Sequence, residues 1–189
     1  MSIKSINRGL VSAGILGIFL STYALYVEMA AEARPGYKAL CDISERASCS
    51  RVLTSEYSKG FGVVAKNSAF EVPNCIYGIL FYCIMIFLST YDNLLAVRLQ
   101  VVLGVSSVIS CVYLAYLLIF VLGDFCIVCV STYFVNAAIT YASFKKHSAL
   151  KCKNRQVSSD ALTCPSRRCN VKQHLCPPST LRMKRPWQM

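Results

Sequence analysis

The chain contains 189 residues, of which 55% are hydrophobic and 15% are charged. Soluble domains carry about 25% charged residues, so this composition argues against a water-soluble globular protein, and the length suits a single domain. The formal net charge is +11, yet eleven Lys and Arg residues and only one acidic residue lie from Lys145 onward. The basic charge therefore belongs to a C-terminal tail, which argues against a groove that binds nucleic acid.

Four uncharged stretches are long enough to cross a membrane, which requires about 20 apolar residues. In chain order they are 9–27, 72–91, 99–123 and 125–144. Lipid cannot form hydrogen bonds with the backbone, so each stretch should be helical. Asp124 alone separates the last two, which predicts a tight helical hairpin. The sequence thus predicts an all-α membrane protein, a four-transmembrane-helix bundle with a lumenal loop or cap between its first two helices.

The first stretch has an alternative interpretation as a cleaved signal peptide. Lys4 and Arg8 precede the apolar run, and Ala31 and Ala33 follow it with the spacing of a cleavage site. The run is longer than the 7–15 residues of a typical signal peptide, which favours a retained helix.

The distribution of basic residues predicts the orientation. Lys4 and Arg8 lie before the first span, the basic tail follows the last, and positive charge is retained in the cytosol. Both termini should therefore be cytosolic, whereas the 28–71 loop and the hairpin tip face the lumen. Residues 1–147 are expected to form the membrane domain, and residues 148–189 a basic, disordered cytosolic tail.

Four of the eleven cysteines should gather at the lumenal face, where disulfides can form. The Cys126-x-x-Cys129 pair opens the fourth helix, and Cys41 and Cys49 lie in the lumenal loop. A helix N-terminus favours thiolate over thiol, and Asp124 is placed to cap this helix. These features predict a thiol–disulfide relay. A zinc site that includes Cys41 and Cys49, or purely structural disulfides, are the alternatives.

A redox pair that faces a membrane suggests a lipid-soluble partner such as a quinone. Tyr133 lies four residues after Cys129 and shares its helix face, and Asn74 stands at the start of the second span. Either side chain could form a hydrogen bond with a quinone oxygen. Tyr133 could equally be an interfacial belt tyrosine, and Asn74 a helix cap.

Several motifs together carry a family resemblance. They are Cys41-Asp42, Ser48-Cys49-Ser50, Gly60-Phe61-Gly62, Asn74 followed by Gly78, and Asp124-Phe125-Cys126-Ile127-Val128-Cys129 with Thr132-Tyr133. In order and spacing over residues 10–147 the chain resembles the vitamin K epoxide reductase family.

This resemblance implies a role for each candidate residue. Cys129 would attack the substrate, Cys126 would be its disulfide partner and exchange with Cys49, and Cys41 would receive electrons from a thioredoxin-like protein. Asn74 and Tyr133 would bind the quinone oxygens. Four further residues would line the apolar pocket: Phe81, Tyr77, Leu122 and Val52.

The reaction that the resemblance implies is thiol-dependent reduction of vitamin K 2,3-epoxide to the quinone and then to the hydroquinone. It would take place in the endoplasmic reticulum membrane, with a donor of the protein disulfide isomerase type, no metal and no bound cofactor beyond the redox-active disulfide. Coumarin-type inhibitors would compete for the pocket. A disulfide-forming oxidoreductase that passes electrons from protein thiols to a quinone, and a non-catalytic scaffold with a stapled loop, are the alternatives.

Four features depart from the family pattern. Tyr57 stands where the family usually has Trp, and Tyr77 where it usually has Phe. The segment 62–74 is shorter than usual, and it belongs to the expected lid over the pocket. The tail after Leu150 matches nothing in the family.

Overall fold

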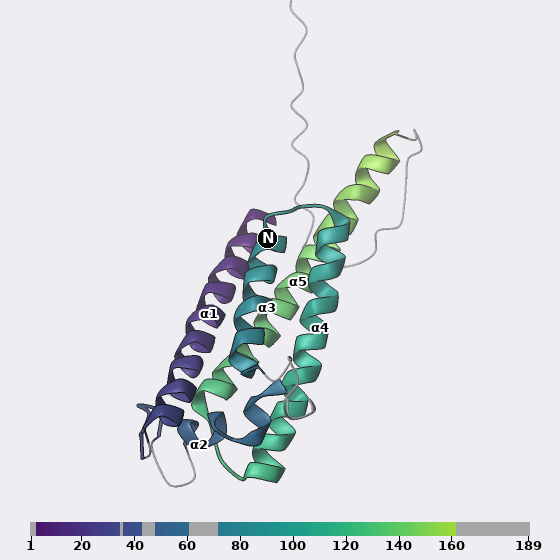
Figure 1. The fold of residues 1–189 in the computed structure, drawn as a ribbon. Coiled ribbons are helices and arrows are strands. Elements are labelled where there is room, and N and C mark those ends of the chain that lie inside the picture. The colour runs from purple at the N-terminus through teal and green to yellow at the C-terminus, as the bar shows by residue number, and fades with distance from the viewer. Residues whose placement is uncertain (1–2, 35, 43–47, 61–71, 162–189) are drawn as a thin grey trace, which may run out of the picture.

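The computed structural model describes residues 3–34, 36–42, 48–60 and 72–161. Its four long helices are α1 (Ile3–Ala33), α3 (Asn74–Ser89), α4 (Leu94–Tyr116) and α5 (Ile127–Ala161), and they lie side by side as a bundle (Figure 1). Every regular element in the described part of the chain is helical, which confirms the predicted all-α class. The start of α1 and the C-terminal half of α5 lie at the same end of the bundle (Figure 1).

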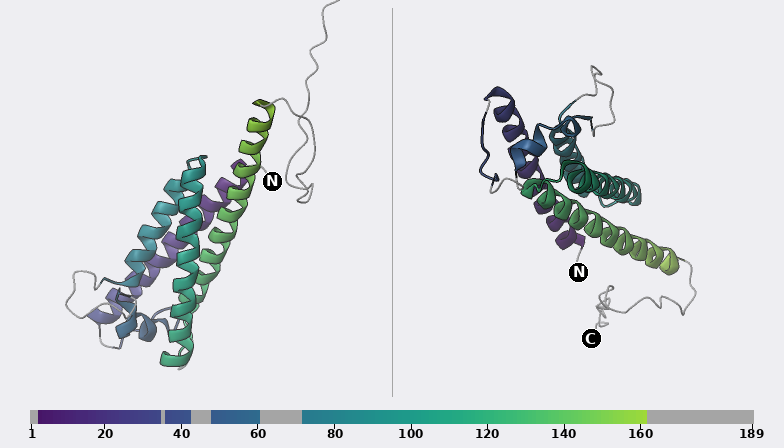
Figure 2. Two further views of the ribbon diagram at one scale, coloured as in Figure 1. Left: turned by 90° about the vertical axis from the view of Figure 1, so that its right-hand side faces the viewer. Right: turned by 90° about the horizontal axis from the view of Figure 1, so that it is seen from below.

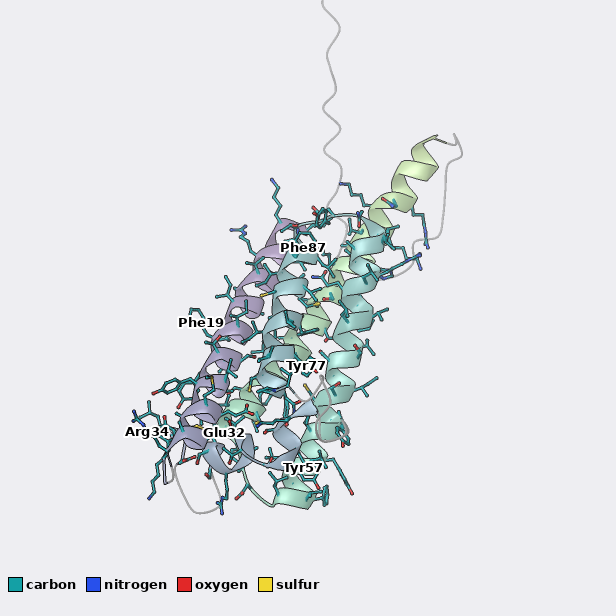
Figure 3. All side chains as sticks on the ribbon, in the orientation of Figure 1. Phe19, Glu32, Arg34, Tyr57, Tyr77 and Phe87 are labelled. Carbon is teal, nitrogen blue, oxygen red and sulfur yellow. A yellow bond between two sulfur atoms is a disulfide. The ribbon has the colours of Figure 1, made fainter. Side chains whose placement is uncertain are left out.

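Three of the predicted spans form helices that are long and apolar enough to cross a membrane: Ile3–Ala33, Leu94–Leu122 and Ile127–Arg155. The remaining predicted span, 72–91, forms α3, which has 16 residues. At 1.5 Å per residue α3 extends about 24 Å, less than the roughly 30 Å of a typical hydrocarbon core. The bundle turns large apolar side chains outward: Phe19 is 68% exposed and Phe87 is 61% exposed, and Figure 3 shows Phe19 on the outer side of α1.

Two short elements cap the other end of the bundle, α2 (Cys49–Leu53) and η1 (Glu56–Ser58). At the same end α4 continues as the π-helical segment η3 (Leu117–Leu122). Gly123 then adopts a left-handed conformation with φ of 65°, which commonly ends a helix. The connection to α5 is therefore longer than the single residue predicted, since residues 123–126 are all non-helical.

Small residues set the distance between α1 and α3. A Cβ atom at Gly17 would overlap the ring of Tyr82, and one at Gly14 would lie 2.6 Å from Ile86 Cγ1. Gly78 on α3 faces Ser21 in the same way, with 2.8 Å from its hypothetical Cβ to the hydroxyl oxygen. Membrane helices use such small residues for close backbone approach. This packing brings the last turns of α1 beside the first turn of α3.

A buried lysine fastens the opposite end. Lys146 of α5 is 0% exposed, and its ammonium donates to the carbonyl oxygens of Ser89 and Tyr91 at 2.9 Å each. It also lies 3.2 Å from the Asp92 carboxylate, which in turn accepts a hydrogen bond from Asn7 of α1 at 3.0 Å. The pKa of Asp92 is lowered by the hydrogen bond from Asn7 and by Lys146. This cluster joins α1, the α3–α4 connection and α5.

The end of α5 lies beyond the expected domain boundary. The boundary at residue 147 falls inside α5, which continues to Ala161 and projects past the other helices (Figure 2). Residues 162–189 of the expected tail and most of the 62–74 segment lie outside the described residues.

Replacing Lys146 tests this fastening. Lys146→Met removes the donor from two carbonyl oxygens, and each buried group left without a partner costs about 1–3 kcal/mol. We therefore expect a lower thermal unfolding midpoint in detergent. The matched control is Lys145→Met, since Lys145 lies over the Tyr141 ring at 4.7 Å and is only partly buried. Equal midpoints for the two variants would contradict the proposed importance of the buried cluster.

Candidate functional site

A cavity of about 320 Å³ lies between the helices beneath the cap, within the usual size of small-molecule sites. Its walls come from α1, α3, α4 and α5, and its cap side from α2 and η1. Seven of the predicted site residues line it: Val52, Asn74, Tyr77, Phe81, Leu122, Cys129 and Tyr133. Tyr57, which like Tyr77 departs from the family pattern, also lines the cavity.

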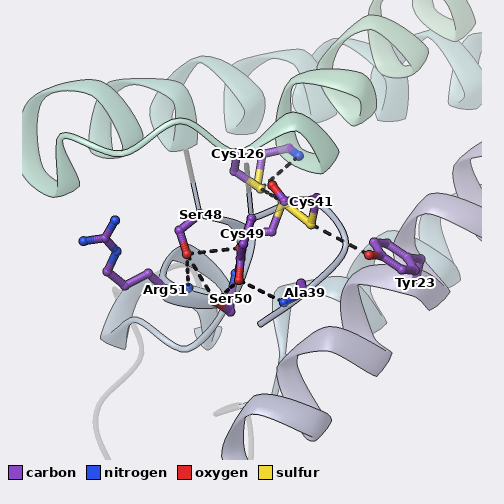
Figure 4. The surroundings of a disulfide bond; sticks show 10 residues. Tyr23, Ala39, Cys41, Ser48, Cys49, Ser50, Arg51 and Cys126 are labelled. Atoms are coloured by element: carbon purple, nitrogen blue, oxygen red, sulfur yellow. Dashed lines mark hydrogen bonds between the residues drawn. A yellow bond between two sulfur atoms is a disulfide. The ribbon is translucent and has the colours of Figure 1, made fainter. Parts of the chain in front are cut away.

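The remaining three predicted cysteines form a cluster beside the cavity. Cys41 and Cys49 are joined by a disulfide, and the Cys126 sulfur lies 3.6 Å from the Cys49 sulfur. Figure 4 shows Cys126 against this disulfide, with the Tyr23 hydroxyl directed at Cys41. Cys49 and Cys126 are both completely buried. The loop pair and the helix pair, distant in sequence, are thus in contact through Cys49 and Cys126.

Cys126, and not Asp124 as predicted, occupies the N-cap position of α5. The Cys126 sulfur accepts a hydrogen bond from the backbone N–H of Cys129 at 3.4 Å. The backbone carbonyl of Cys126 accepts a hydrogen bond from the Val130 N–H at 3.1 Å. The cysteine itself therefore caps α5. Asp124 instead forms an ion pair with Arg51 of α2 at 3.0 Å, so the prediction of an Asp124 cap is wrong. The four-residue connection before α5 turns Asp124 toward α2.

The environment of Cys126 favours its thiolate. The hydrogen bond from the Cys129 thiol and, to a smaller degree, backbone N–H groups at the start of α5 lower the pKa of Cys126, and together they outweigh burial, which raises it. Unpaired N–H groups at a helix N-terminus stabilise a thiolate in this way. Cys126 is therefore the sulfur best prepared to attack the neighbouring disulfide.

The two cysteines of the pair face different partners. Cys129 lines the cavity, whereas Cys126 is not among the lining residues and contacts Cys49. A molecule in the cavity would meet Cys129, and the loop disulfide meets Cys126. The arrangement can pass electrons between the cap and the cavity through one disulfide exchange at a time.

Asp42 holds the loop cysteines in place. Its carboxylate accepts hydrogen bonds from the Ser50 hydroxyl at 2.6 Å, the Ser50 N–H at 3.1 Å, the Ser48 hydroxyl at 3.1 Å and the Ala39 N–H at 2.9 Å. Burial acts to raise the pKa of Asp42, but these hydrogen bonds outweigh burial and lower it. Asp42 thereby fixes the start of α2, where Cys49 lies. The sequence showed Asp42 only as part of a motif, without this role.

The spacing of Cys41, Asp42 and Cys49 also bears on the zinc alternative. Their ligand atoms lie within 4.8 Å of one another, a spacing that a metal ion could bridge. Here the two sulfurs are bonded to each other, and both Asp42 oxygens already accept hydrogen bonds. In this redox state the donor set fits a disulfide-bonded cap better than a metal centre.

The two predicted polar contacts differ in what they do. Asn74 is the first residue of α3, and Pro73 takes the cap position. The Asn74 amide donates to the Tyr57 carbonyl at 2.8 Å, which ties the cap to the cavity wall. Tyr133 lines the cavity one turn after Cys129, and its hydroxyl has no hydrogen-bond partner among the described residues.

Sequence reasoning missed much of the polar lining. Asn136 donates to the Cys111 sulfur at 3.0 Å and accepts from the Tyr82 hydroxyl at 2.8 Å, and all three residues line the cavity. The helical spacing of Cys129, Tyr133 and Asn136 on α5 was a signal that could have identified Asn136. Cys75, Thr132 and serines of α4 also line the cavity.

Comparison with known proteins agrees with this geometry. Residues 9–144 match the Vitamin K epoxide reductase family. The chain is 40% identical over 154 residues to Vitamin K epoxide reductase complex subunit 1 of Rattus norvegicus, an alignment that covers 79% of this chain and 96% of the rat protein. It is 41% identical over 143 residues to the protein of the same name from Mus musculus, covering 74% of this chain and 89% of the mouse protein.

The family match includes most of α1, all of α3 and α4, the first half of α5 and the four cysteines of the predicted relay. The chain therefore belongs to the vitamin K epoxide reductase family.

Proposed function

We propose that this chain reduces vitamin K 2,3-epoxide to the quinone, and the quinone to the hydroquinone, with thiols as the source of electrons. One observation carries the proposal: Cys129 lines an apolar cavity while its partner Cys126 contacts a second cysteine pair. The names of the rat and mouse relatives point to the same activity. The substrate's fused ring would lie among the apolar and aromatic side chains of the cavity.

In the first step the Cys129 thiolate attacks an epoxide carbon, and the carbon–oxygen bond breaks. The oxygen takes a proton and becomes a hydroxyl group. Tyr133, whose hydroxyl lines the cavity, would donate a hydrogen bond to an oxygen that gains negative charge. Asn74, which lines the same cavity, would contribute the second polar contact.

In the second step the Cys126 thiolate attacks the Cys129 sulfur and the carbon–sulfur bond breaks. The released electron pair expels the hydroxyl group, which leaves as water once protonated. In balance, one epoxide and two thiols give one quinone, one water molecule and the Cys126–Cys129 disulfide. A further round converts the quinone and two thiols into the hydroquinone and one disulfide.

The relay would then be reset through the cap. A donor of the protein disulfide isomerase type reduces the Cys41–Cys49 disulfide by attack at Cys41. The donor's second thiol then releases Cys41. The freed Cys49 thiolate attacks Cys126 of the Cys126–Cys129 disulfide, and Cys129 leaves as the thiolate. Cys41 finally attacks Cys49, which releases Cys126 and forms the Cys41–Cys49 disulfide again. The short distance between the Cys49 and Cys126 sulfurs, 3.6 Å, supports this route. No metal or additional bound cofactor is required by these steps.

We place the protein in the endoplasmic reticulum membrane with cytosolic termini and a lumenal cap. In this arrangement α3 is the fourth span. The endoplasmic reticulum bilayer is thinner than average, about 27 Å, which a helix of about 24 Å followed by a short connection can cross. Coumarin-type inhibitors would compete with the substrate for the cavity.

Cysteine variants test the relay. With dithiothreitol as donor, Cys129→Ser should reduce epoxide turnover at least 100-fold, because the attacking sulfur is lost. Cys41→Ser should retain turnover with dithiothreitol, which can reduce the helix pair directly, and lose it with a disulfide isomerase as donor. Turnover is measured by chromatography of the quinone product.

The control for these variants is Cys83→Ser, since Cys83 is exposed on the outside of α3. Full activity of Cys129→Ser would refute the assignment of the nucleophile. Assays with the epoxide and with the quinone as separate acceptors distinguish this function from a disulfide-forming oxidoreductase, for which the epoxide would not be consumed.

Replacing Tyr133 tests the oxyanion contact. Tyr133→Phe keeps the ring and removes the donor, and loss of one such donor lowers kcat by about 10²–10³-fold. Tyr141→Phe on the same helix is the control, because Tyr141 is 61% exposed and does not line the cavity. If both variants had the kcat of the unmodified protein, Tyr133 would have no part in catalysis.

A further inference from the structure

The cavity contains a thiol that the proposed mechanism does not use. Cys75, in the first turn of α3, lines it together with Cys129. Cys111 of α4 is another lining thiol, but its sulfur accepts the hydrogen bond from Asn136 described above. Cys75 differs because its sulfur is paired with a carboxylate.

That carboxylate belongs to Glu28 of α1, which is only 1% exposed. The Cys75 thiol donates to one Glu28 oxygen at 3.7 Å, and the Ser58 hydroxyl donates to the other at 3.4 Å. Lys59, which forms an ion pair with Glu32 at 2.8 Å, also acts on Glu28 electrostatically. A buried acid is costly unless it is hydrogen-bonded, and here its partners include a thiol that faces the cavity.

Cys75 is also close to the redox pair. Cys75 and Cys129 pack against the same buried cluster, which contains Cys49 and Cys126. Cys75 and Cys129 therefore line the same cavity and border the same buried cluster, and Cys75 lies beside a carboxylate that can take its proton.

We propose that Cys75 is a third redox-active thiol of the cavity, which forms a disulfide with Cys129 while Glu28 accepts its proton. The proposal deepens the proposed function but its chemistry requires no substrate. Cys75 would serve as a second resolving thiol for Cys129.

The exchange step is balanced. Cys75 transfers its proton to Glu28 and its thiolate attacks Cys129 of the Cys126–Cys129 disulfide. A Cys75–Cys129 bond forms, the Cys126–Cys129 bond breaks, and Cys126 leaves as the thiolate. The number of disulfides stays constant, so no external oxidant is consumed. Attack by Cys126 on Cys129 reverses the step and restores the Cys75 thiol.

The same thiol can resolve a substrate adduct. When Cys129 carries the opened epoxide, Cys75 attacks the Cys129 sulfur in place of Cys126. The carbon–sulfur bond breaks, the quinone and water are released, and two thiols have become the Cys75–Cys129 disulfide. Cys75 could therefore release the substrate from Cys129 even while Cys126 is bonded to Cys49.

The test maps disulfides in the full-length Cys126→Ser protein in detergent. Diamide, which oxidises two thiols to a disulfide and is itself reduced to the hydrazine, is added, and peptides are analysed by mass spectrometry without reduction. We expect a Cys75–Cys129 peptide. Adding Cys75→Ser should abolish it, whereas adding Cys111→Ser, the matched cavity thiol, should leave its yield unchanged.

A Cys129 that remains reduced, or that pairs equally with Cys111, would overturn the proposal. Glu28→Gln in the same background keeps one of the two acceptor oxygens and removes the base, so disulfide formation should slow roughly tenfold or more. An unchanged rate would refute the part assigned to Glu28. Because the readout involves no vitamin K, failure here is distinguishable from failure of the epoxide reductase assay.

Discussion

The contact between the sulfurs of Cys126 and Cys49 is the interaction on which the rest of the site depends. It joins a cap held by Asp42 to the start of α5, where the Cys126 sulfur accepts a hydrogen bond from the Cys129 N–H. Capping by sulfur places the cysteine at the positive end of α5, where its thiolate is favoured. The ion pair between Arg51 and Asp124 brings α2 and the start of α5 together. The same position of Cys126 therefore serves both the start of α5 and the contact with Cys49.

That contact also separates two chemical tasks. Cys126 meets the loop disulfide, and Cys129 meets the apolar cavity. A sulfur can hold only one disulfide bond, so Cys126 cannot be bonded to the cap and to Cys129 together. In the proposed relay, alternation between the two partners would let a small lipid-soluble molecule and a soluble protein exchange electrons without direct contact. The additional thiol Cys75, supported by Glu28, lies on the cavity side of this division.

The sequence predicted the helices better than their ends. Runs of apolar residues suffice to locate spans, because lipid imposes helical structure on them. The end of η3 depended on the left-handed Gly123, and the partner of Asp124 lies on α2, 73 positions earlier in the chain. For the site, residue positions identified the cysteine pair and the polar candidates Asn74 and Tyr133, whereas the four apolar pocket residues came from the family resemblance. The pairing of Glu28 with Cys75 required the close approach of α1 and α3, which glycine packing creates and hydropathy does not reveal.

The projection of α5 changes how the basic charge at this end should be pictured. Residues 147–161 add about 22 Å of helix beyond the Lys146 cluster, and Lys151, Lys153 and Arg155 are exposed along it. Attraction to anionic lipid decays within about 8 Å at physiological salt. In the proposed membrane arrangement, α5 would carry part of this charge beyond the reach of the headgroups and present it to the aqueous phase.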